Sequence, residues 1–159
     1  MHFTTADLSD AYPESVRVLE PLFRDYGATD HFSGPVETVQ VFEDNALVRR
    51  TLEGNGEGRV LVVDGGGSLK CALVGGRLAQ LARSNGWSGL LINGCVRDLL
   101  ELARVPIGIR ALNATPVRSG KEGKGSVGSA VTFAGVLIVP GQILYADQDG
   151  TILANRALI

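Results

Sequence analysis

Arg97 and Asp98 are adjacent residues whose side chains could bind a small anionic molecule and act on it chemically. The guanidinium of an arginine is planar and always charged, so Arg97 could grip a carboxylate or an enolate through two hydrogen bonds. An aspartate offers the oxygen ligands that Mg²⁺ and Mn²⁺ accept, and Mg²⁺ usually takes only one or two protein carboxylates. One carboxylate is enough to begin such a site, so we interpret Asp98 as a candidate metal ligand.

The segment Gly75-Gly76-Arg77-Leu78 is a second candidate, because it opens an amphipathic helical pattern that continues with Leu81 and Ala82. The first turn of a helix presents backbone N–H groups without partners, together with the positive end of the helix dipole. An anionic group, most simply a carboxylate, is therefore expected close to this turn.

Three turns should bring these residues together. Residues 60–63 and 89–92 are continuously apolar runs, typical of strands covered on both faces, and each is followed by a glycine-containing turn. Ligands in open α/β sheets bind at the carboxyl ends of such strands. We therefore expect residues 64–67, Gly75-Gly76 and residues 93–98 to converge on one site.

Spacing alone leaves more ordinary interpretations open. Arg97 and Glu101 are four residues apart and could form a solvated pair on one helix, with Asp98 serving only the helix dipole. Gly75-Gly76 could be a helix break that binds nothing.

Other motifs can be set aside. Residues 123–128 read GKGSVG, but no buried strand precedes them and no helix follows, as a dinucleotide site requires. Lys121 and Lys124 lack the neighbouring Ser or Thr of a phosphate-binding loop. His2 and His31 lie in no zinc-binding pattern.

The elements that must position these residues form an α/β rhythm of strand, turn and helix, which predicts parallel central strands. We predict strands at residues 36–41, 60–63 and 89–92, with helices at 46–50, 69–73, from 77 onward, and 96–103. The last third predicts short, mainly antiparallel strands at residues 107–111, 131–133, 136–139, 143–145 and 151–153. The segment 115–129, rich in Gly, Ser and Lys, is expected to be irregular and mobile.

Composition narrows the class of protein. The 159 residues fit one domain, 1–159, and 45% hydrophobic with 20% charged residues is ordinary for a compact globular fold. A net charge of −2 gives no basic excess for direct binding of nucleic acid. Because the sequence has no secretory signal and no apolar run of about 20 residues, we expect a cytoplasmic protein without membrane contact. Cys71 and Cys95 are expected to be reduced core thiols.

The sequence resembles the RraA-like family, which includes 4-hydroxy-4-methyl-2-oxoglutarate aldolases and the regulator of ribonuclease E activity A. The similarity covers nearly the whole chain. Its motifs are Gly75 followed at a fixed spacing by Arg97-Asp98, Phe42-Glu43-Asp44-Asn45, Val62-Val63-Asp64-Gly65-Gly66-Gly67-Ser68, Gly86-Trp87-x-Gly89, Asn93-Gly94-Cys95-Val96-Arg97-Asp98 and Tyr145-Ala146-Asp147-x-Asp149-Gly150.

The resemblance implies a β/β/α swivelling-type fold and a homotrimer with active sites between subunits. It implies that the substrate, a small 2-oxo dicarboxylic acid, contacts Gly75, Gly76, Arg77, Leu78 and Arg97. It further implies that Asp98 holds a divalent cation, Mg²⁺ or Mn²⁺, partly through water, with Glu101 as a weaker metal ligand.

The function implied is that of a metal-dependent lyase that cleaves 4-hydroxy-4-methyl-2-oxoglutarate-type acids to pyruvate and decarboxylates oxaloacetate. Many bacterial aldolases of the family carry a carboxylate where this chain has Gly76, which favours decarboxylation over aldol cleavage here. The alternative is a protein inhibitor that binds ribonuclease E. Regulators of that type tend to lack the aspartate after the arginine, so Asp98 favours the enzyme.

Overall fold

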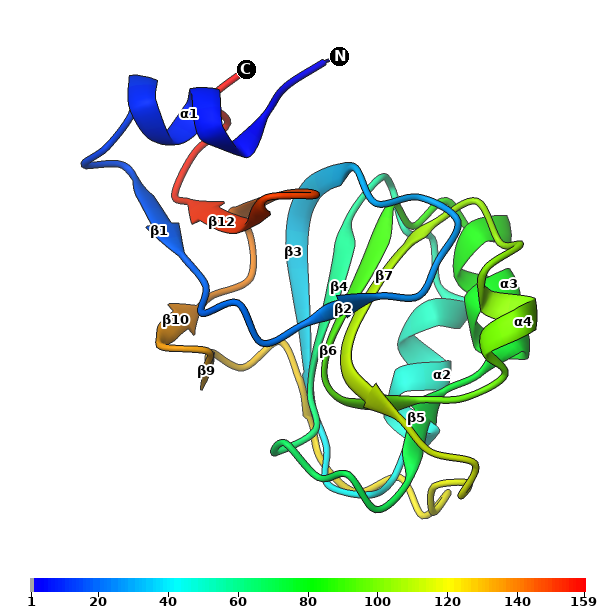
Figure 1. Cartoon of the computed structure of the whole chain (residues 1–159). Helices are drawn as coiled ribbons and strands as arrows, with labels where there is room; N and C mark the ends of the chain where they lie inside the picture. The colour runs from blue at the N-terminus through cyan, green and yellow to red at the C-terminus, as the bar shows by residue number, and fades with distance from the viewer. Residues whose placement is uncertain (1) are drawn as a thin grey trace.

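A computed structural model describes residues 2–159 and contains one large mixed sheet flanked by short helices (Figure 1). The helices are α1 (Thr5–Ala11), α2 (Ala46–Glu53), α3 (Gly76–Ser84) and α4 (Leu99–Leu102). The strands are β1 (Val16–Val18), β2 (Arg24–Asp25), β3 (Phe32–Gln40), β4 (Val60–Asp64), β5 (Ala72–Val74), β6 (Gly89–Val96), β7 (Gly108–Ala114), β8 (Ser126–Val127), β9 (Val131–Phe133), β10 (Val136–Ile138), β11 (Ile143–Asp147) and β12 (Gly150–Ala154).

The large sheet runs in the order β1-β12-β11-β3-β4-β6-β7-β2, with β5 paired to β6 and β8 paired to β3. Strands β3, β4, β6 and β7 are parallel neighbours, as the α/β rhythm predicts. The N-terminal half of β3 pairs antiparallel with β11, which itself pairs antiparallel with β12. Strand β3 therefore joins the parallel centre to an antiparallel region, and the predicted α/β fold class is confirmed.

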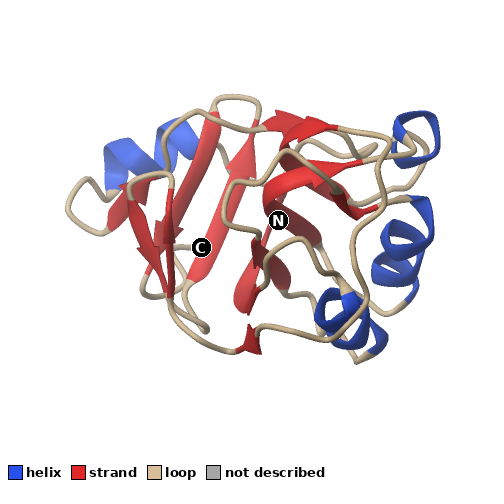
Figure 2. Cartoon of the chain, turned by 90° about the horizontal axis from the view of Figure 1, so that it is seen from below, coloured by secondary structure: helices blue, strands red, loops and turns tan. Residues whose placement is uncertain are grey.

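The parallel strands are buried on both faces, as their continuous apolar sequence predicts. In β4, Leu61 and Val63 belong to the hydrophobic cluster that includes the buried faces of α2 and α3, whereas Val60 and Val62 belong to a second cluster. That second cluster includes residues of β9 and β10. Figures 1 and 2 show α2, α3 and α4 gathered on one side of the molecule, with α1 at the other end.

Two predicted helices are wrong. Residues 69–71 lead into β5 and residues 72–73 belong to it, and the helix expected at residues 96–103 is reduced to the single turn α4. The reason is that Cys95 and Val96 are buried and extend β6 far enough to pair with both β5 and β7. Because these edge pairings satisfy backbone groups on both sides, the strand continues where the glycine at position 94 suggested a turn.

The prediction of mainly antiparallel strands in the last third holds for β9, β10, β11 and β12. It holds only in part for residues 107–111, because β7 pairs antiparallel with the short strand β2 on one side and parallel with β6 on the other. Strand β7 lies parallel to β6, and it follows the short connection through α4. Cys71 and Cys95 are free and buried, as expected, and burial raises the pKa of both thiols.

The segment 115–129, predicted to be mobile, is held against the body of the protein. Asp44 is almost fully buried, and its carboxylate accepts hydrogen bonds from the backbone N–H groups of Glu122 (2.6 Å) and Gly123 (3.2 Å). Burial acts to raise the pKa of Asp44, but these backbone donors outweigh it and lower that pKa. The prediction failed because the acceptor lies far away in the sequence.

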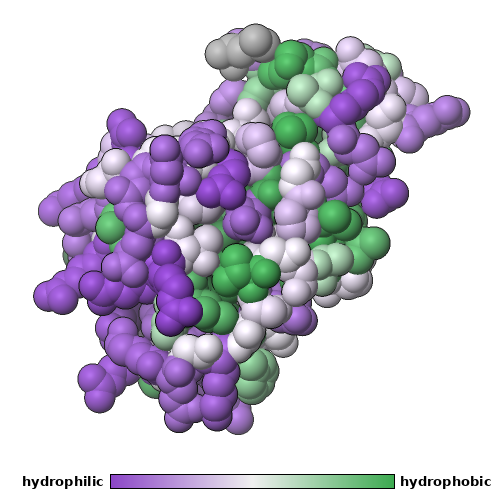
Figure 3. Space-filling view, turned by 180° about the vertical axis from the view of Figure 1, so that it is seen from behind, coloured by the Kyte–Doolittle hydropathy of each residue, from purple (hydrophilic) through white to green (hydrophobic). Residues whose placement is uncertain are grey.

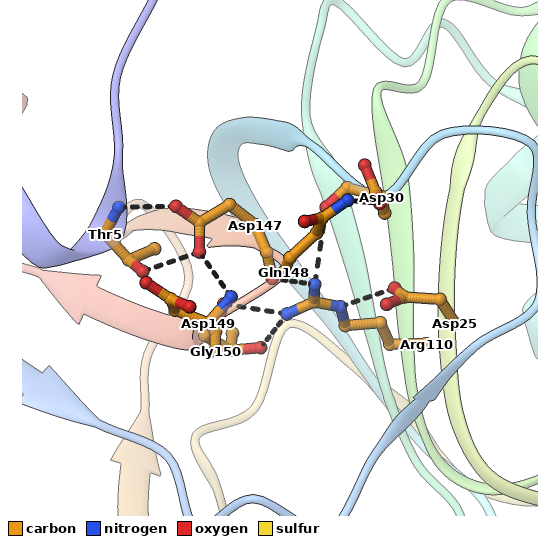
Figure 4. A network of polar contacts seen from close by, with 9 residues as sticks. Thr5, Asp25, Asp30, Arg110, Asp147, Gln148, Asp149 and Gly150 are labelled. Atoms are coloured by element: carbon orange, nitrogen blue, oxygen red, sulfur yellow. Dashed lines mark hydrogen bonds and ion pairs between the residues drawn. The ribbon is translucent and has the colours of Figure 1, made fainter.

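A second polar network ties α1 to the sheet (Figure 4). The Asp147 carboxylate accepts hydrogen bonds from the backbone N–H and the hydroxyl of Thr5, both at 2.6 Å, and from the N–H of Asp149 at 3.0 Å. The buried Arg110 pairs with Asp25 at 2.8 Å and donates to the carbonyl oxygens of Asp147 and Gly150. The network joins the N-terminal segment, β7 and the turn between β11 and β12.

Across residues 2–159, no helix is long and apolar enough to cross a membrane. Seen from behind, the surface is mostly hydrophilic, and its hydrophobic residues form small separate groups (Figure 3).

Replacing Asp147 by asparagine should lower the free energy of unfolding at pH 7 by about 1–3 kcal/mol, because an amide offers one acceptor oxygen to three donors. Burial raises the pKa of Asp147, but the hydrogen bonds to its carboxylate outweigh it and hold the pKa below the ordinary 3.8. The stability is therefore complete above that value and is lost as the pH falls through the folded-state pKa.

Urea unfolding at neutral pH and at about pH 3 measures the free energy of unfolding of the unaltered protein and of Asp147→Asn. The difference between these two free energies should be smaller in acid. Asp149→Asn, which removes the same charge at an exposed position two residues away, is the matched control. An equal loss in the control, or a difference that acid leaves unchanged, would show that the buried carboxylate is not the source.

Candidate active site

A cavity of about 440 Å³ lies where the start of α3, the end of β6 and the segment 115–125 meet. Most of its lining residues are polar, and five are cationic. The lining residues are Asn45, Arg49, Ala72, Gly75, Arg77, Leu78, Arg97, Asp98, Glu101, Arg118, Ser119 and Lys121. The cavity thus brings together every predicted site residue except Gly76, which is buried directly behind it.

Asp98 caps the N-terminus of α3. Its Oδ2 accepts a hydrogen bond of 2.9 Å from the backbone N–H of Gly76, the first residue of that helix. The interpretation that Asp98 serves a helix end is therefore correct in part, but the helix is α3 and not its own. The N–H groups of Arg77 and Leu78 have no intrahelical acceptor in a first turn, so the positive end of α3 still faces the cavity.

The ends of two acidic side chains lie close to both glycines. A Cβ on Gly75 would lie 2.6 Å from Oδ2 of Asp98, and a Cβ on Gly76 would collide with the carboxylate of Glu101. Gly75-Gly76 is therefore more than a helix break, because any side chain here would displace one of the two carboxylates.

Asp98 adopts the left-handed conformation, with φ 63° and ψ 48°. This region is uncommon for residues other than glycine, although aspartate tolerates it better than most, and such residues are frequent at functional sites. The neighbouring backbone is fixed, because the N–H of Arg97 donates to the carbonyl oxygen of Val74 at 3.0 Å. The turn after β6 thus presents the Arg97 and Asp98 side chains to the same cavity.

The alternative of a solvated Arg97–Glu101 helix pair is wrong. Helix α4 begins at Leu99, so Arg97 precedes it, and the two side chains form no ion pair in the described structure. Instead, Nη1 of Arg97 donates to the carbonyl oxygen of Pro116 at 3.4 Å. The Oε1 of Glu101 accepts a hydrogen bond of 2.6 Å from Gln80.

One of the three turns expected at the site lies elsewhere. Asp64 and Gly66 line a different hollow, together with Phe42 and Lys124. Asn93 links this turn to β6, since its side chain donates to Oδ1 of Asp64 at 3.0 Å. The turn lies apart because β6 continues past Asn93, which carries Arg97 and Asp98 to a position farther along the sheet.

Three cations that were not predicted to reach the site also line the cavity. Arg49 comes from α2, whereas Arg118 and Lys121 come from the segment that was expected to be mobile. The basic residues of that segment were a usable signal, but contacts with residues far away in the sequence, those of Asp44 among them, bring them to the cavity.

The carboxylates fit a hard divalent cation that keeps most of its water. Nowhere in residues 2–159 do three or more His, Cys, Asp or Glu side chains gather as a metal cage. Asp98 is exposed and uses only one oxygen for Gly76, and Oε2 of Glu101 has no hydrogen-bond partner within the described residues. Such a donor set suits Mg²⁺ or Mn²⁺ and would be too sparse for a structural zinc site.

Known proteins resemble this chain along its whole length. The family model RraA-like, described as Aldolase/RraA, matches residues 5–153. A protein from Paraburkholderia phytofirmans, provisionally named a 4-hydroxy-4-methyl-2-oxoglutarate aldolase, is 55% identical over 99% of both chains.

Two solved structures share the fold closely, each with a TM-score of 0.96. One is described as S-adenosylmethionine: 2-dimethylmenaquinone methyltransferase from Geobacillus kaustophilus; it is 49% identical and the match covers 98% of this chain and 97% of that one. The other is described as the RNA-processing inhibitor RraA from Thermus thermophilis; it is 50% identical and the match covers 100% of this chain and 96% of that one. This chain therefore belongs to the RraA-like family.

Proposed function

We propose that this protein is a divalent-metal-dependent lyase that releases pyruvate from 4-hydroxy-4-methyl-2-oxoglutarate-type acids and decarboxylates oxaloacetate. The observation that carries the proposal is the cavity in which Arg97 and Asp98 meet the N-terminus of α3. The provisional aldolase name of the relative that is 55% identical supports the same reaction class.

The residues of this chain bind and orient the 2-oxo acid. The guanidinium of Arg97 takes the carboxylate next to the 2-oxo group. It also shares the negative charge that develops on the 2-oxo oxygen when the C3–C4 bond breaks and its electron pair passes into the pyruvate enolate. The first-turn N–H groups of Arg77 and Leu78 add positive potential on the same side. The hydrogen bond from Gly76 fixes the orientation of Asp98 at the cavity and leaves Oδ1 without a hydrogen-bond partner within the described residues.

Asp98 would hold the divalent cation, with Glu101 as a second acidic group nearby, and the bound cation would act as a Lewis acid toward the 2-oxo oxygen. The cavity has five cationic and only two acidic lining residues, so a free cation is repelled there. An anionic substrate offsets that repulsion. Metal and substrate should therefore bind cooperatively.

Glu101 bears on which of the two reactions is faster. Retro-aldol cleavage needs a group to accept the proton of the 4-hydroxyl, whereas decarboxylation of oxaloacetate needs none. The Glu101 carboxylate lies directly over Gly76, where many aldolases of the family carry an acidic side chain. Because one of its oxygens is engaged by Gln80, we expect decarboxylation to be the faster reaction.

A second candidate function is inhibition of ribonuclease E, favoured by the likeness to the RNA-processing inhibitor RraA. Capture of purified ribonuclease E by this protein, combined with no pyruvate release from either acid, would select the inhibitor over the lyase. A methyltransferase role is not proposed, because residues 123–125 lie in a loop, residues 126–127 form β8, and the next element is the strand β9 and not a helix.

Assembly and compartment belong to the same proposal. We expect a homotrimer with active sites between subunits, in the cytoplasm, where 2-oxo acids arise. The cavity is consistent with an inter-subunit site, since Asp98 and Glu101 lie exposed at its rim.

Asp98→Asn should lower kcat/KM for oxaloacetate in the presence of Mg²⁺ by about a hundredfold or more, because the amide is a poor ligand for a hard cation. The amide oxygen can still accept the Gly76 N–H, so the fold should persist. Coupled detection of pyruvate measures the rate.

Asp10→Asn, an exposed acid on α1 far from the cavity in the sequence and fold, is the control and should behave as the unaltered protein. A rate unaffected by Asp98→Asn, or by EDTA, would rule out the metal-dependent reaction.

Oxalate, a planar dianion that resembles the enolate of pyruvate, should tighten Mn²⁺ binding by about tenfold or more, because it offsets the positive charge of the cavity. By linkage, Mn²⁺ should tighten oxalate binding by the same factor. Calorimetric titration in both orders measures the pair. Equal Mn²⁺ affinity with and without oxalate would contradict cooperative binding.

A further inference from the structure

The positive charge of the cavity exceeds what one carboxylate requires. Five cationic side chains line it against the acidic Asp98 and Glu101. Within residues 2–159, the three ion pairs are Arg59–Glu37, Arg110–Asp25 and Lys124–Glu122, so none of the five cations is paired. Unpaired like charges in one cavity repel each other, and a ligand with several negative charges relieves that repulsion.

The cations divide by the elements that carry them. Arg77 and Arg97 stand beside the Asp98 turn, where the proposed function places the carboxylate and 2-oxo group of the substrate. Arg49 belongs to α2, and Arg118 and Lys121 belong to the segment between β7 and β8. No step of the proposed reaction uses these last three cations.

The backbone that carries Arg118 is fixed on both sides. On one side, the carbonyl oxygen of Val117 accepts a hydrogen bond of 2.7 Å from the N–H of Ala72, the first residue of the strand β5 that leads to Gly75. On the other side, the carbonyl oxygen of Gly120 accepts one of 3.0 Å from Asn45. Arg118 is therefore presented to the cavity by an ordered segment, which reduces the entropy lost when it binds a ligand.

Asp44 anchors the same segment beyond Lys121. Its buried carboxylate accepts the N–H groups of Glu122 and Gly123, so the chain cannot lift away without leaving a buried charge unsatisfied. Asp44 itself does not line the cavity. It acts as a positioning residue for the two cations that precede the contact.

We propose that Arg118 and Arg49 bind a second carboxylate of the substrate, remote from the 2-oxo group, and so select 2-oxo acids with two or more carboxylates over monocarboxylic ones. This inference rests on the proposed function for the position of the first carboxylate at Arg97. Arginine suits the role because its guanidinium engages a carboxylate through two parallel hydrogen bonds. Lys121 adds a further positive charge to the same wall.

The test compares two ligands that do not react and differ only at the far end: 2-oxoglutarate and 2-oxopentanoate. Calorimetric titration in the presence of Mg²⁺ should show 2-oxoglutarate binding at least about tenfold more tightly, as expected for one charge-assisted contact. Arg118→Gln and Arg49→Gln should each weaken 2-oxoglutarate by about tenfold and leave 2-oxopentanoate within about twofold.

Arg50→Gln is the matched control, because Arg50 is the next residue of α2, is equally exposed and does not line the cavity. It removes the same charge and should leave both affinities unchanged. Asp44→Asn should reproduce the selective loss of 2-oxoglutarate binding, because it frees the segment without altering either arginine. Circular dichroism confirms that each variant remains folded.

Each outcome separates the inference from the proposed function. Equal affinity of the unaltered protein for the two ligands, or binding of neither, overturns the second-carboxylate site whatever the lyase activity. An equal loss of affinity for both ligands in Arg118→Gln also overturns the second-carboxylate site. Such a loss would show that Arg118 only contributes to the overall positive potential of the cavity. Selective binding of 2-oxoglutarate without release of pyruvate from oxaloacetate supports the site and overturns the lyase.

Discussion

The hydrogen bond from the N–H of Gly76 to the carboxylate of Asp98 is the contact on which the candidate site depends. It joins the end of β6 to the start of α3, two elements that the hydrophobic core already packs together. The left-handed backbone of Asp98 is unfavourable in isolation and persists because this contact and the neighbouring pairing of Arg97 with Val74 determine it. This contact fixes the orientation of the carboxylate, which uses one oxygen for Gly76 and lines the cavity.

A second constraint is the buried carboxylate of Asp44, which converts a glycine-rich segment into part of the cavity wall. Burial of a charge is unfavourable unless hydrogen bonds replace the lost water, and here backbone N–H groups supply them. The same segment could not pack through apolar contacts, since most of its side chains are small or polar. Hydrogen bonds to the buried carboxylate thus hold this loop in place, whereas burial in the hydrophobic core holds β4 and β6.

The central parallel strands could be predicted from the sequence. The continuous apolar residues of β4 and β6 indicate strands that are buried on both faces, as the structure shows. The sequence also predicted that Gly75, Arg77, Arg97 and Asp98 share a site. It failed where long-range pairing decides the structure: β6 extends through Gly94 because β5 and β7 flank it. It failed for the cavity wall for the same reason, since no local pattern pairs a carboxylate with N–H groups far along the chain.

The distribution of charge explains how a chain with a net charge of −2 can hold a strongly positive cavity. The three ion pairs of the described residues use Arg59, Arg110 and Lys124, none of which lines the cavity. The five cations of the cavity are therefore in no ion pair. Such an arrangement lowers stability slightly, because like charges are held close together, and it favours a polyanionic ligand by the same amount. An anionic ligand relieves this repulsion when it binds, and the relief is greatest for the ligand that brings the most negative charge.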